Sequence, residues 1–306
     1  MVISRDSTDP AVIDLQWMGL PGCVAAWRVG DVLIDCGPAT TLLRLIERCG
    51  EWRPKALLLT HIHFDHAGAA GDLVARWPDL DVYVHRRGAR HLAAPAQLES
   101  SARRVFGDEF DLRFGALRPI PEERLRPLDG NETIGPFRVK ATPGHASHHV
   151  AFLHDSGLAF PGDLCGIRLA AHGPVLLPTP PPDIDLDLWS ASLELVADWQ
   201  PTALALPHFG RFADPEAHFD ATRRHLALVR DLVARRVDLD RYTHAINGAL
   251  GLEDEPQLRE QYDQLGPLEQ NLLGLQRWWA GRDQSYSGAG LGGHLSQLVW
   301  KRDRPS

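Results

Sequence analysis

Residues 55–76 constrain the fold most, because an apolar run leads directly into a dense group of metal-binding side chains. The run Ala-Leu-Leu-Leu at 56–59 predicts a short buried strand. Through Thr60 it is followed by four side chains that can bind a metal, His61, His63, Asp65 and His66. Histidine and carboxylate ligands together suit zinc, iron or manganese better than calcium or magnesium. The sequence therefore predicts a transition-metal site at the end of a core strand.

A packing explanation for this group is weaker than a metal explanation. One histidine alone is usually a surface residue or a satisfied core residue. Four ligand-type side chains within six residues exceed what packing requires, and the loop beyond a strand end is a usual place for chemistry. We therefore interpret the group as a metal site.

The composition excludes several classes of partner. With 306 residues the chain can form one large domain or two smaller ones, and 44% hydrophobic and 24% charged residues are typical of a globular protein. The formal net charge of −8 argues against a nucleic-acid or anionic membrane partner, since both need clustered Lys and Arg. No stretch approaches the length of a membrane span. We expect no nucleic-acid partner and no membrane partner.

The four cysteines predict free thiols. Cys23, Cys36, Cys49 and Cys165 are widely spaced and form no CxxC pair, so neither a disulfide framework nor an all-cysteine zinc site is expected. Residues 1–10 carry charged side chains and no apolar core, unlike a signal peptide. These features predict a protein of the reducing cytoplasm.

The rest of the first two thirds of the chain alternates between strand and helix patterns. Strands are expected at 12–17, 23–29, 32–35, 81–85, 137–141, 149–153, 158–160 and 203–206, and helices at 41–49, 67–77 and 186–199. Three of the later strand ends carry a ligand candidate, His145, Asp163 or His208. This succession implies a layered α/β domain with its site along one sheet edge.

Two regions lack any ligand motif. Residues 86–129 carry many arginines and prolines, and we interpret them as a helical cap inserted into a metal-binding domain of residues 1–213. Residues 214–306 show apolar spacings of three and four, typical of helices that pack on a main domain. The alternative for this C-terminal region is the interface of a homo-oligomer or a surface that gates the substrate.

Four motifs follow one another along the chain: Thr60-His61-Ile62-His63-Phe64-Asp65-His66, Gly144-His145, Gly162-Asp163 and Pro207-His208. In this order they resemble the metallo-β-lactamase superfamily, specifically its glyoxalase II-like hydrolase branch, over about residues 11–210. The resemblance implies an αββα sandwich, extended by the C-terminal helices, with a centre of two metal ions. It implies that the first metal is held by His61, His63 and His145. The second would be held by Asp65, His66 and His208, and Asp163 would bridge the two.

The resemblance also implies a hydrolase that acts on a small-molecule ester, thioester, lactone or phosphoester. Two metals about 3.5–4 Å apart can share a hydroxide that attacks the substrate. Asp65 would orient this hydroxide and pass its proton to the leaving group. Zinc is the expected metal, with iron or manganese as alternatives. Classical β-lactamases lack the bridging aspartate, so Asp163 argues against lactam hydrolysis.

Two other functions stay open at this point. One is a mononuclear iron oxidoreductase resembling persulfide dioxygenase, which would draw its ligands from among His61, His63, His145 and Asp163. The other is a non-catalytic metal-binding protein.

Four residues close to the motifs have supporting roles in this interpretation. His148 or His149, just behind His145, could orient a ligand histidine, because ligating histidines need hydrogen-bond partners. Arg168 and Arg211 could hold a substrate anion through paired hydrogen bonds.

Overall fold

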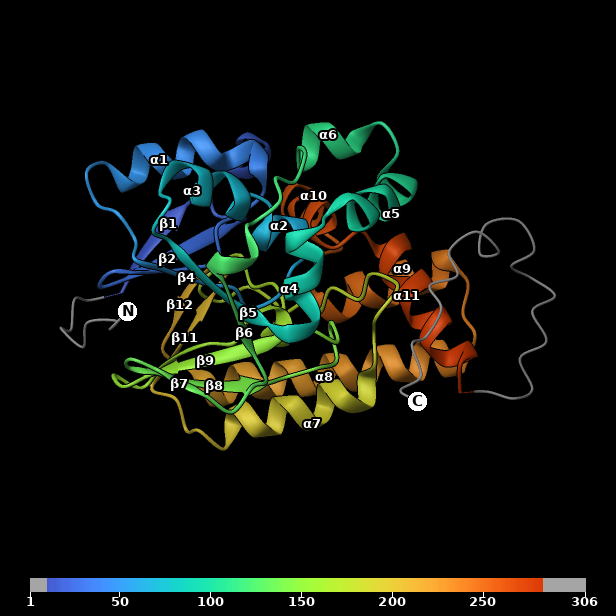
Figure 1. The fold of residues 1–306 in the computed structure, drawn as a ribbon. Coiled ribbons are helices and arrows are strands. Elements are labelled where there is room, and N and C mark those ends of the chain that lie inside the picture. Colours follow the sequence, from blue (N-terminus) through green and yellow to red (C-terminus); the bar gives the residue numbers. More distant parts are fainter. Residues whose placement is uncertain (1–9, 283–306) are drawn as a thin grey trace.

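Two six-stranded sheets lie face to face at the centre of residues 10–282, the part of the chain that this computed structural model describes (Figure 1). In spatial order the first sheet contains β1 (Ala11–Asp14), β2 (Ala25–Val29), β3 (Val32–Ile34), β4 (Ala56–Leu58), β5 (Asp81–His85) and β6 (Leu125–Leu128). The second contains β12 (Gly210–Phe212), β11 (Ala203–Leu206), β10 (Leu158–Phe160), β9 (Val150–His154), β8 (Phe137–Ala141) and β7 (Thr133–Ile134). Each sheet is therefore built from one continuous part of the sequence.

Helices cover the outer face of each sheet (Figure 1). α1 (Leu42–Cys49) and α3 (Ala70–Arg76) pack on the first sheet, and α7 (Leu186–Ala197) and α8 (Pro215–Ala234) pack on the second. The short helix α2 (Phe64–Ala67) and four 3-10 turns complete this part: η1 (Trp17–Gly19), η2 (Ala39–Thr41), η3 (Glu122–Arg124) and η4 (Gly162–Cys165). The layer order of helix, sheet, sheet and helix is the αββα sandwich that the sequence predicts.

Three apolar clusters hold the four layers together. The middle cluster lies between the sheets and includes Trp27 and Phe152. One outer cluster joins the first sheet to its helices through residues such as Leu45, and the other joins the second sheet to its helices through Trp189 and Val229. Complete burial of one such side chain contributes roughly 1.5–3 kcal/mol, so the sandwich is stabilised by apolar packing, independently of the polar site.

β4 lies inside the first sheet and leads into the first ligand motif. It pairs in parallel with β3 on one side and with β5 on the other, and all its residues are buried. A strand covered on both faces needs apolar residues throughout, which explains the unbroken run at 56–59. Parallel pairing also brings the carboxyl ends of β3 and β4 to one edge, where Asp35 and Thr60 are hydrogen-bonded.

The expected cap at 86–129 is helical only in its first part. It contains α4 (Arg86–Ala93), α5 (Ala96–Phe106) and α6 (Glu109–Arg113). Its end forms β6 instead, which pairs in parallel with β5, so the helical interpretation of that end was wrong. Pro127 obscured the strand pattern in the sequence, but an edge strand tolerates proline, and Leu125 and Leu128 on either side are buried.

The C-terminal region continues with α9 (Leu239–Leu250), α10 (Pro256–Leu265) and α11 (Leu268–Ala280). Leu204 in the second sheet belongs to the same apolar cluster as Phe219 in α8, Ile246 in α9 and Leu275 in α11. This continuity supports the prediction that the C-terminal helices pack on the main domain. A boundary at residue 213 and a homo-oligomer both stay predictions.

The four cysteines are free and buried, as the sequence predicts. Burial raises the pKa of the Cys23 and Cys49 thiols to about 11, which keeps both protonated at neutral pH. Within residues 10–282, no helix combines the length and the apolar character needed to cross a membrane.

His225, on α8, makes the stability of this fold sensitive to acid. Its ring is buried, its Nε2 has no hydrogen-bond partner among the described residues, and burial lowers its pKa from 6.5 to about 4. The unfolded chain takes up this proton near the ordinary pKa while the folded chain resists it, so stability is lost as the pH falls from about 6.5 to about 4. We expect His225→Leu to remove the part of this acid-dependent loss of unfolding free energy that the His225 ring causes, which is up to roughly 3 kcal/mol.

Urea denaturation at pH 7.5 and at pH 4.5 measures this effect as a difference in the free energy of unfolding. His172→Leu is the matched control, because His172 is exposed and its replacement should leave the acid-dependent loss unchanged. Equal acid-dependent losses in the wild type and in His225→Leu would contradict the role of the buried ring.

Candidate metal centre

The seven predicted ligands come from four segments that each follow the carboxyl end of a strand. The first motif follows β4, and His63 immediately precedes α2. His145 follows β8, Asp163 lies in η4 after β10, and His208 follows β11. Both sheets thus contribute ligands, and three later segments of the chain bring their side chains to the same edge as the first motif.

The structure brings all seven side chains into three overlapping groups. Within each group the candidate ligand atoms lie within 4.8 Å of one another. The groups are His61, His63 and His145; His61, His66 and Asp163; and Asp65, His66 and His208. Their sharing of His61 and His66 makes them one continuous centre.

The spacing of the nitrogen atoms fits a transition metal. His63 Nδ1 lies 3.0 Å from His61 Nε2 and 2.9 Å from His145 Nε2, and His66 Nε2 lies 3.2 Å from His208 Nε2. A tetrahedral zinc site with bonds of about 2.0–2.1 Å separates neighbouring ligands by about 3.4 Å. The histidines are therefore already close to the spacing that such an ion requires.

Asp163 lies between the two sets of histidines. Its Oδ1 lies 3.3 Å from His66 Nε2 and 3.5 Å from His208 Nε2, whereas its Oδ2 lies 3.4 Å from His145 Nε2. The side chain is buried, and Oδ1 has no hydrogen bond of standard geometry with any described residue. A buried carboxylate oxygen without a partner is costly, and a bound cation would satisfy it.

The outward-facing nitrogens of three histidines are held by neighbouring groups. His61 Nδ1 lies 3.1 Å from Thr60 Oγ1, and the Nδ1 atoms of His145 and His208 lie 2.9 Å from the carbonyl oxygens of Pro178 and Cys23. A carbonyl oxygen only accepts hydrogen bonds, and Thr60 Oγ1 also accepts here because it donates its own hydrogen to Asp35 Oδ2. These contacts therefore keep the proton of each ring on Nδ1 and leave Nε2 unprotonated toward the centre.

Asp35 supports both sets of ligands, and the sequence analysis missed it. Its Oδ1 accepts a hydrogen bond from the Thr60 N–H at 2.8 Å, and its Oδ2 accepts from Thr60 Oγ1 at 2.8 Å and from His66 Nδ1 at 3.0 Å. It therefore orients His66 directly and His61 through the Thr60 hydroxyl. The signal in the sequence was an aspartate at the last position of a predicted strand, and it gains meaning only once that strand is known to pair with β4.

Burial and mutual charge set the protonation of the cluster. Burial, together with neighbouring histidines, lowers the pKa of His61 well below its usual value and that of His63 to about 3. Burial opposes charge on Asp163 and Asp65, yet nearby His66 and His208 outweigh it, holding the pKa of Asp163 well below its usual value and that of Asp65 at about 2. Burial lowers the pKa of His66 and His208, but the Asp163 and Asp65 carboxylates outweigh it and hold both pKa values above the usual value, so metal binding there would release protons.

The supporting residues named from the sequence lie around this centre, with different partners. His149 Nδ1 lies 2.7 Å from Thr142 Oγ1, and its ring centroid lies 5.1 Å from that of His61. Arg168 is buried, donates to Asp214 and packs over the Phe212 ring at 4.3 Å.

These contacts occupy the Arg168 guanidinium, so its expected role in holding a substrate anion is not supported. Arg211 is exposed on β12. His148 contacts the backbone between two ligands, because its Nδ1 accepts a hydrogen bond from the Ile62 N–H at 3.4 Å.

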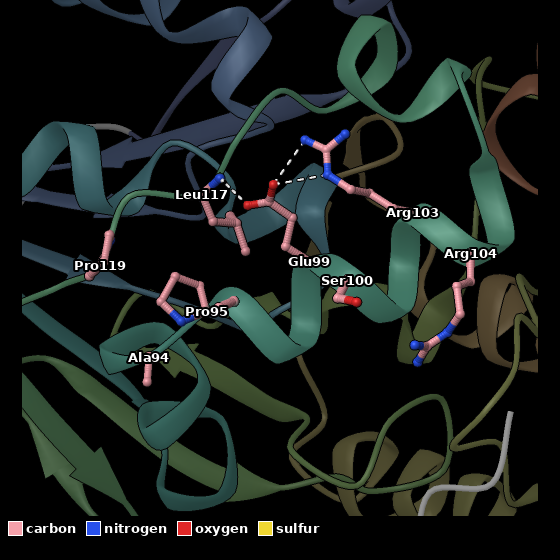
Figure 2. A pocket seen from close by; sticks show the side chains of 9 residues that line it. Ala94, Pro95, Glu99, Ser100, Arg103, Arg104, Leu117 and Pro119 are labelled. Carbon is pink, nitrogen blue, oxygen red and sulfur yellow. Dashed lines mark hydrogen bonds and ion pairs between the residues drawn. The ribbon is translucent and has the colours of Figure 1, made fainter.

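A cavity of about 690 Å³ opens along the cap, away from these ligands. Figure 2 shows it beside α5, with Pro95, Arg104 and Leu117 on its wall. Glu99 also lines it and accepts hydrogen bonds from Arg103 and from the Leu117 N–H. None of the seven candidate ligands lines this cavity, so it is distinct from the metal centre.

We expect Asp35→Asn to lower zinc affinity by about 10–100-fold, the usual effect of losing a group that orients a ligand histidine. An amide cannot replace every acceptor contact that the carboxylate makes with Thr60 and His66. Asp31→Asn, at the opposite end of β3, is the matched control, because the Asp31 carboxylate pairs with Lys55 at 3.1 Å and not with the ligand motifs. Zinc titration of folded protein against a chromophoric chelator measures both variants, and equal affinities would contradict the role of Asp35.

Comparison with known proteins agrees with this geometry. The family model described as the metallo-beta-lactamase superfamily matches residues 29–208, more than half of the chain. The metallo-beta-lactamase fold-containing protein ST1585 of Sulfurisphaera tokodaii is 31% identical over 161 residues, which are 50% of this chain and 60% of that protein. The hydroxyacylglutathione hydrolase of Xanthomonas euvesicatoria is 34% identical over 132 residues, which are 43% of this chain and 40% of that enzyme.

The chain spans about half the length of the curated relatives it matches. Among solved structures, the superposition with ST1585 covers 87% of this chain and 97% of the ST1585 chain, with a TM-score of 0.64 at 22% identity. The superposition with TTHA1429 from Thermus thermophilus covers 89% of this chain and 93% of the TTHA1429 chain, with a TM-score of 0.59 at 21% identity. These structures share the fold, and with the family match over residues 29–208 they establish that the chain belongs to the metallo-β-lactamase superfamily.

Proposed function

We propose that this protein is a dinuclear metal-dependent hydrolase of a small-molecule ester, thioester, lactone or phosphoester. The observation that carries the proposal is the position of Asp163, whose two oxygen atoms face different sets of histidines. One carboxylate placed in this way suits two ions better than one. The histidine spacing and the unpartnered Oδ1 of Asp163 support the same assignment.

In this proposal the ligand sets follow the groups of the structure. The first ion would be held by His61, His63 and His145, the second by Asp65, His66 and His208, and Asp163 would serve both. Bound transition-metal ions would supply a polarised substrate oxygen and a water of lowered pKa. Zinc is the metal we propose, with iron and manganese as alternatives that suit the same histidine and carboxylate donors.

Asp65 is the residue we propose for proton transfer. Its Oδ2 lies 3.6 Å from His66 Nε2 and 3.5 Å from His208 Nε2, which leaves Oδ1 to accept a proton from the attacking water and return it to the leaving group. Its side chain is 19% exposed, whereas those of His66 and His208 are almost completely buried. Substrate would therefore approach from the side of Asp65 and of the partly exposed His63.

The names of the curated relatives support the reaction class. Two of them are a hydroxyacylglutathione hydrolase and a probable metallo-hydrolase, both hydrolases by name. The match covers less than half of the first and about half of the second, so the substrate of this chain does not follow from them. A cytoplasmic location and a homo-oligomer stay predictions.

We expect purified protein to contain two transition-metal ions per chain and to hydrolyse members of a panel of simple esters, thioesters, lactones and phosphodiesters. Removal of the ions with a chelator should abolish turnover, and zinc should restore it. Elemental analysis and the hydrolysis assay test this directly. One iron per chain with oxygen consumption on a persulfide would instead identify a dioxygenase, and bound metal without any turnover would favour a binding protein.

We expect Asp163→Asn to empty the more weakly bound metal site and to lower turnover by several orders of magnitude. The amide loses the negative charge that offsets repulsion between two neighbouring cations, and the hydrolytic water depends on both. The fold should survive, because the sandwich is held by apolar clusters. The measurements are metal content and hydrolysis, with circular dichroism to establish folding.

Asp155→Asn is the matched control for this variant, because Asp155 lies exposed after β9 and touches none of the candidate ligands in the three groups. It should keep both metals and full turnover. If folded Asp163→Asn also kept them, Asp163 would not bridge two ions and the two-metal assignment would be withdrawn.

A further inference from the structure

The segment of residues 166–181, between η4 and α7, contacts the backbone or side chain of two candidate ligands. At one end the Arg168 N–H donates to the His208 carbonyl at 2.5 Å, and the Phe209 N–H donates to the Arg168 carbonyl at 3.2 Å. At the other end the Pro178 carbonyl accepts from His145 Nδ1 at 2.9 Å. The position of this segment therefore affects how both histidines are held.

The C-terminal helices hold this segment in place. On α10, the Tyr262 hydroxyl donates to the Pro174 carbonyl at 2.6 Å and accepts from the Leu169 N–H at 3.2 Å. On α11, a side chain placed on Gly274 would put its Cβ 2.0 Å from the Thr179 carbonyl oxygen. Glycine at 274 is thus what allows α11 to lie directly against the segment.

Asn271 makes the central contact between α11 and the segment. Its Oδ1 accepts from the Thr179 N–H at 2.8 Å, its backbone carbonyl accepts from Thr179 Oγ1 at 3.0 Å, and its Nδ2 donates to the Gly266 carbonyl at 3.0 Å. Asn271 is 1% exposed and Thr179 is completely buried. These hydrogen bonds are shielded from water and set the geometry of both partners.

The Thr179 N–H and the Pro178 carbonyl belong to the same peptide unit. A peptide unit is planar, so a hydrogen bond that fixes the direction of the N–H also fixes the direction of the carbonyl. A bonded N–H also polarises its own carbonyl and makes it a better acceptor. Asn271 Oδ1, the Pro178–Thr179 peptide and the His145 ring therefore form one continuous relay.

We propose that Asn271 is a positioning residue for His145, acting through the Pro178–Thr179 peptide. The relay keeps the His145 proton on Nδ1 and directs Nε2 toward His63 Nδ1, at 2.9 Å, and Asp163 Oδ2, at 3.4 Å. The C-terminal helix α11 thereby contributes to the affinity of the first ligand group for metal, although it supplies no ligand itself. This inference rests on the metal centre assigned in the proposed function.

Zinc affinity of the metal-free full chain, measured by competition with a chromophoric chelator, tests the relay without depending on turnover. We expect Asn271→Ala to weaken one of two zinc sites by about 10-fold or more, the usual range for a group behind a ligand histidine. Thr179→Val is the matched control. It removes a second hydrogen bond between the segment and α11 but keeps the N–H bond to Asn271 Oδ1, so both zinc affinities should stay at the wild-type values.

A contact that only docked α11 would give a different result. It would lower the thermal stability of both Asn271→Ala and Thr179→Val. Zinc affinity would then either fall equally in the two variants or stay unchanged in both. Either of these results in folded protein would overturn the relay while leaving the proposed function intact. Failure of the wild type to bind zinc, iron or manganese would overturn the proposed function, and the relay with it.

A second measurement uses the wild type alone and serves if Asn271→Ala does not fold. Coupling between two sites is reciprocal, so zinc bound at His145 must stabilise the hydrogen bond of the Thr179 N–H. We expect zinc to slow hydrogen exchange of the Thr179 amide at least tenfold more than that of the Thr222 amide in α8. Equal slowing of both amides would overturn the relay.

Discussion

The candidate metal centre depends on one interaction, a buried carboxylate held between two sets of imidazoles. Asp163 is almost completely removed from water, and an isolated charge there would be strongly unfavourable. The charge is tolerated because His66 and His208 face Oδ1 and His145 faces Oδ2. Such a cluster can persist only where the surrounding backbone is rigid, and the apolar sandwich provides that rigidity.

The polar support of this centre comes mostly from groups outside the ligand motifs. Asp35 at the end of β3 holds His66 and, through Thr60, His61. Backbone carbonyls of Cys23 and Pro178 hold His208 and His145. These partners come from loops next to strands of the first sheet and from the segment between η4 and α7. The geometry of the centre is therefore a property of the whole fold, including the C-terminal helices that hold that segment through Asn271.

The same arrangement links the proposed chemistry to the fold. Five of the seven proposed ligands are buried, whereas Asp65 and His63 are partly open to solvent. The cap helices and their separate cavity lie outside the three ligand groups, so changes there can alter the molecular surface without removing a ligand.

The strand and helix patterns of the sequence indicated a layered α/β domain, and its resemblance to the metallo-β-lactamase superfamily implied the αββα sandwich and the seven ligands that the structure brings together. The strand at 56–59 and the first four ligands were recognisable from residues alone, because the apolar run and the motif after it are local patterns. It misread the strand around Pro127, since tolerance of proline depends on lying at a sheet edge. Only the tertiary structure assigned the partners Asp35, Pro178 and Asn271. Their contacts join residues 31, 33 and 92 positions apart, and hydrogen bonds between distant segments leave no periodic trace in a sequence.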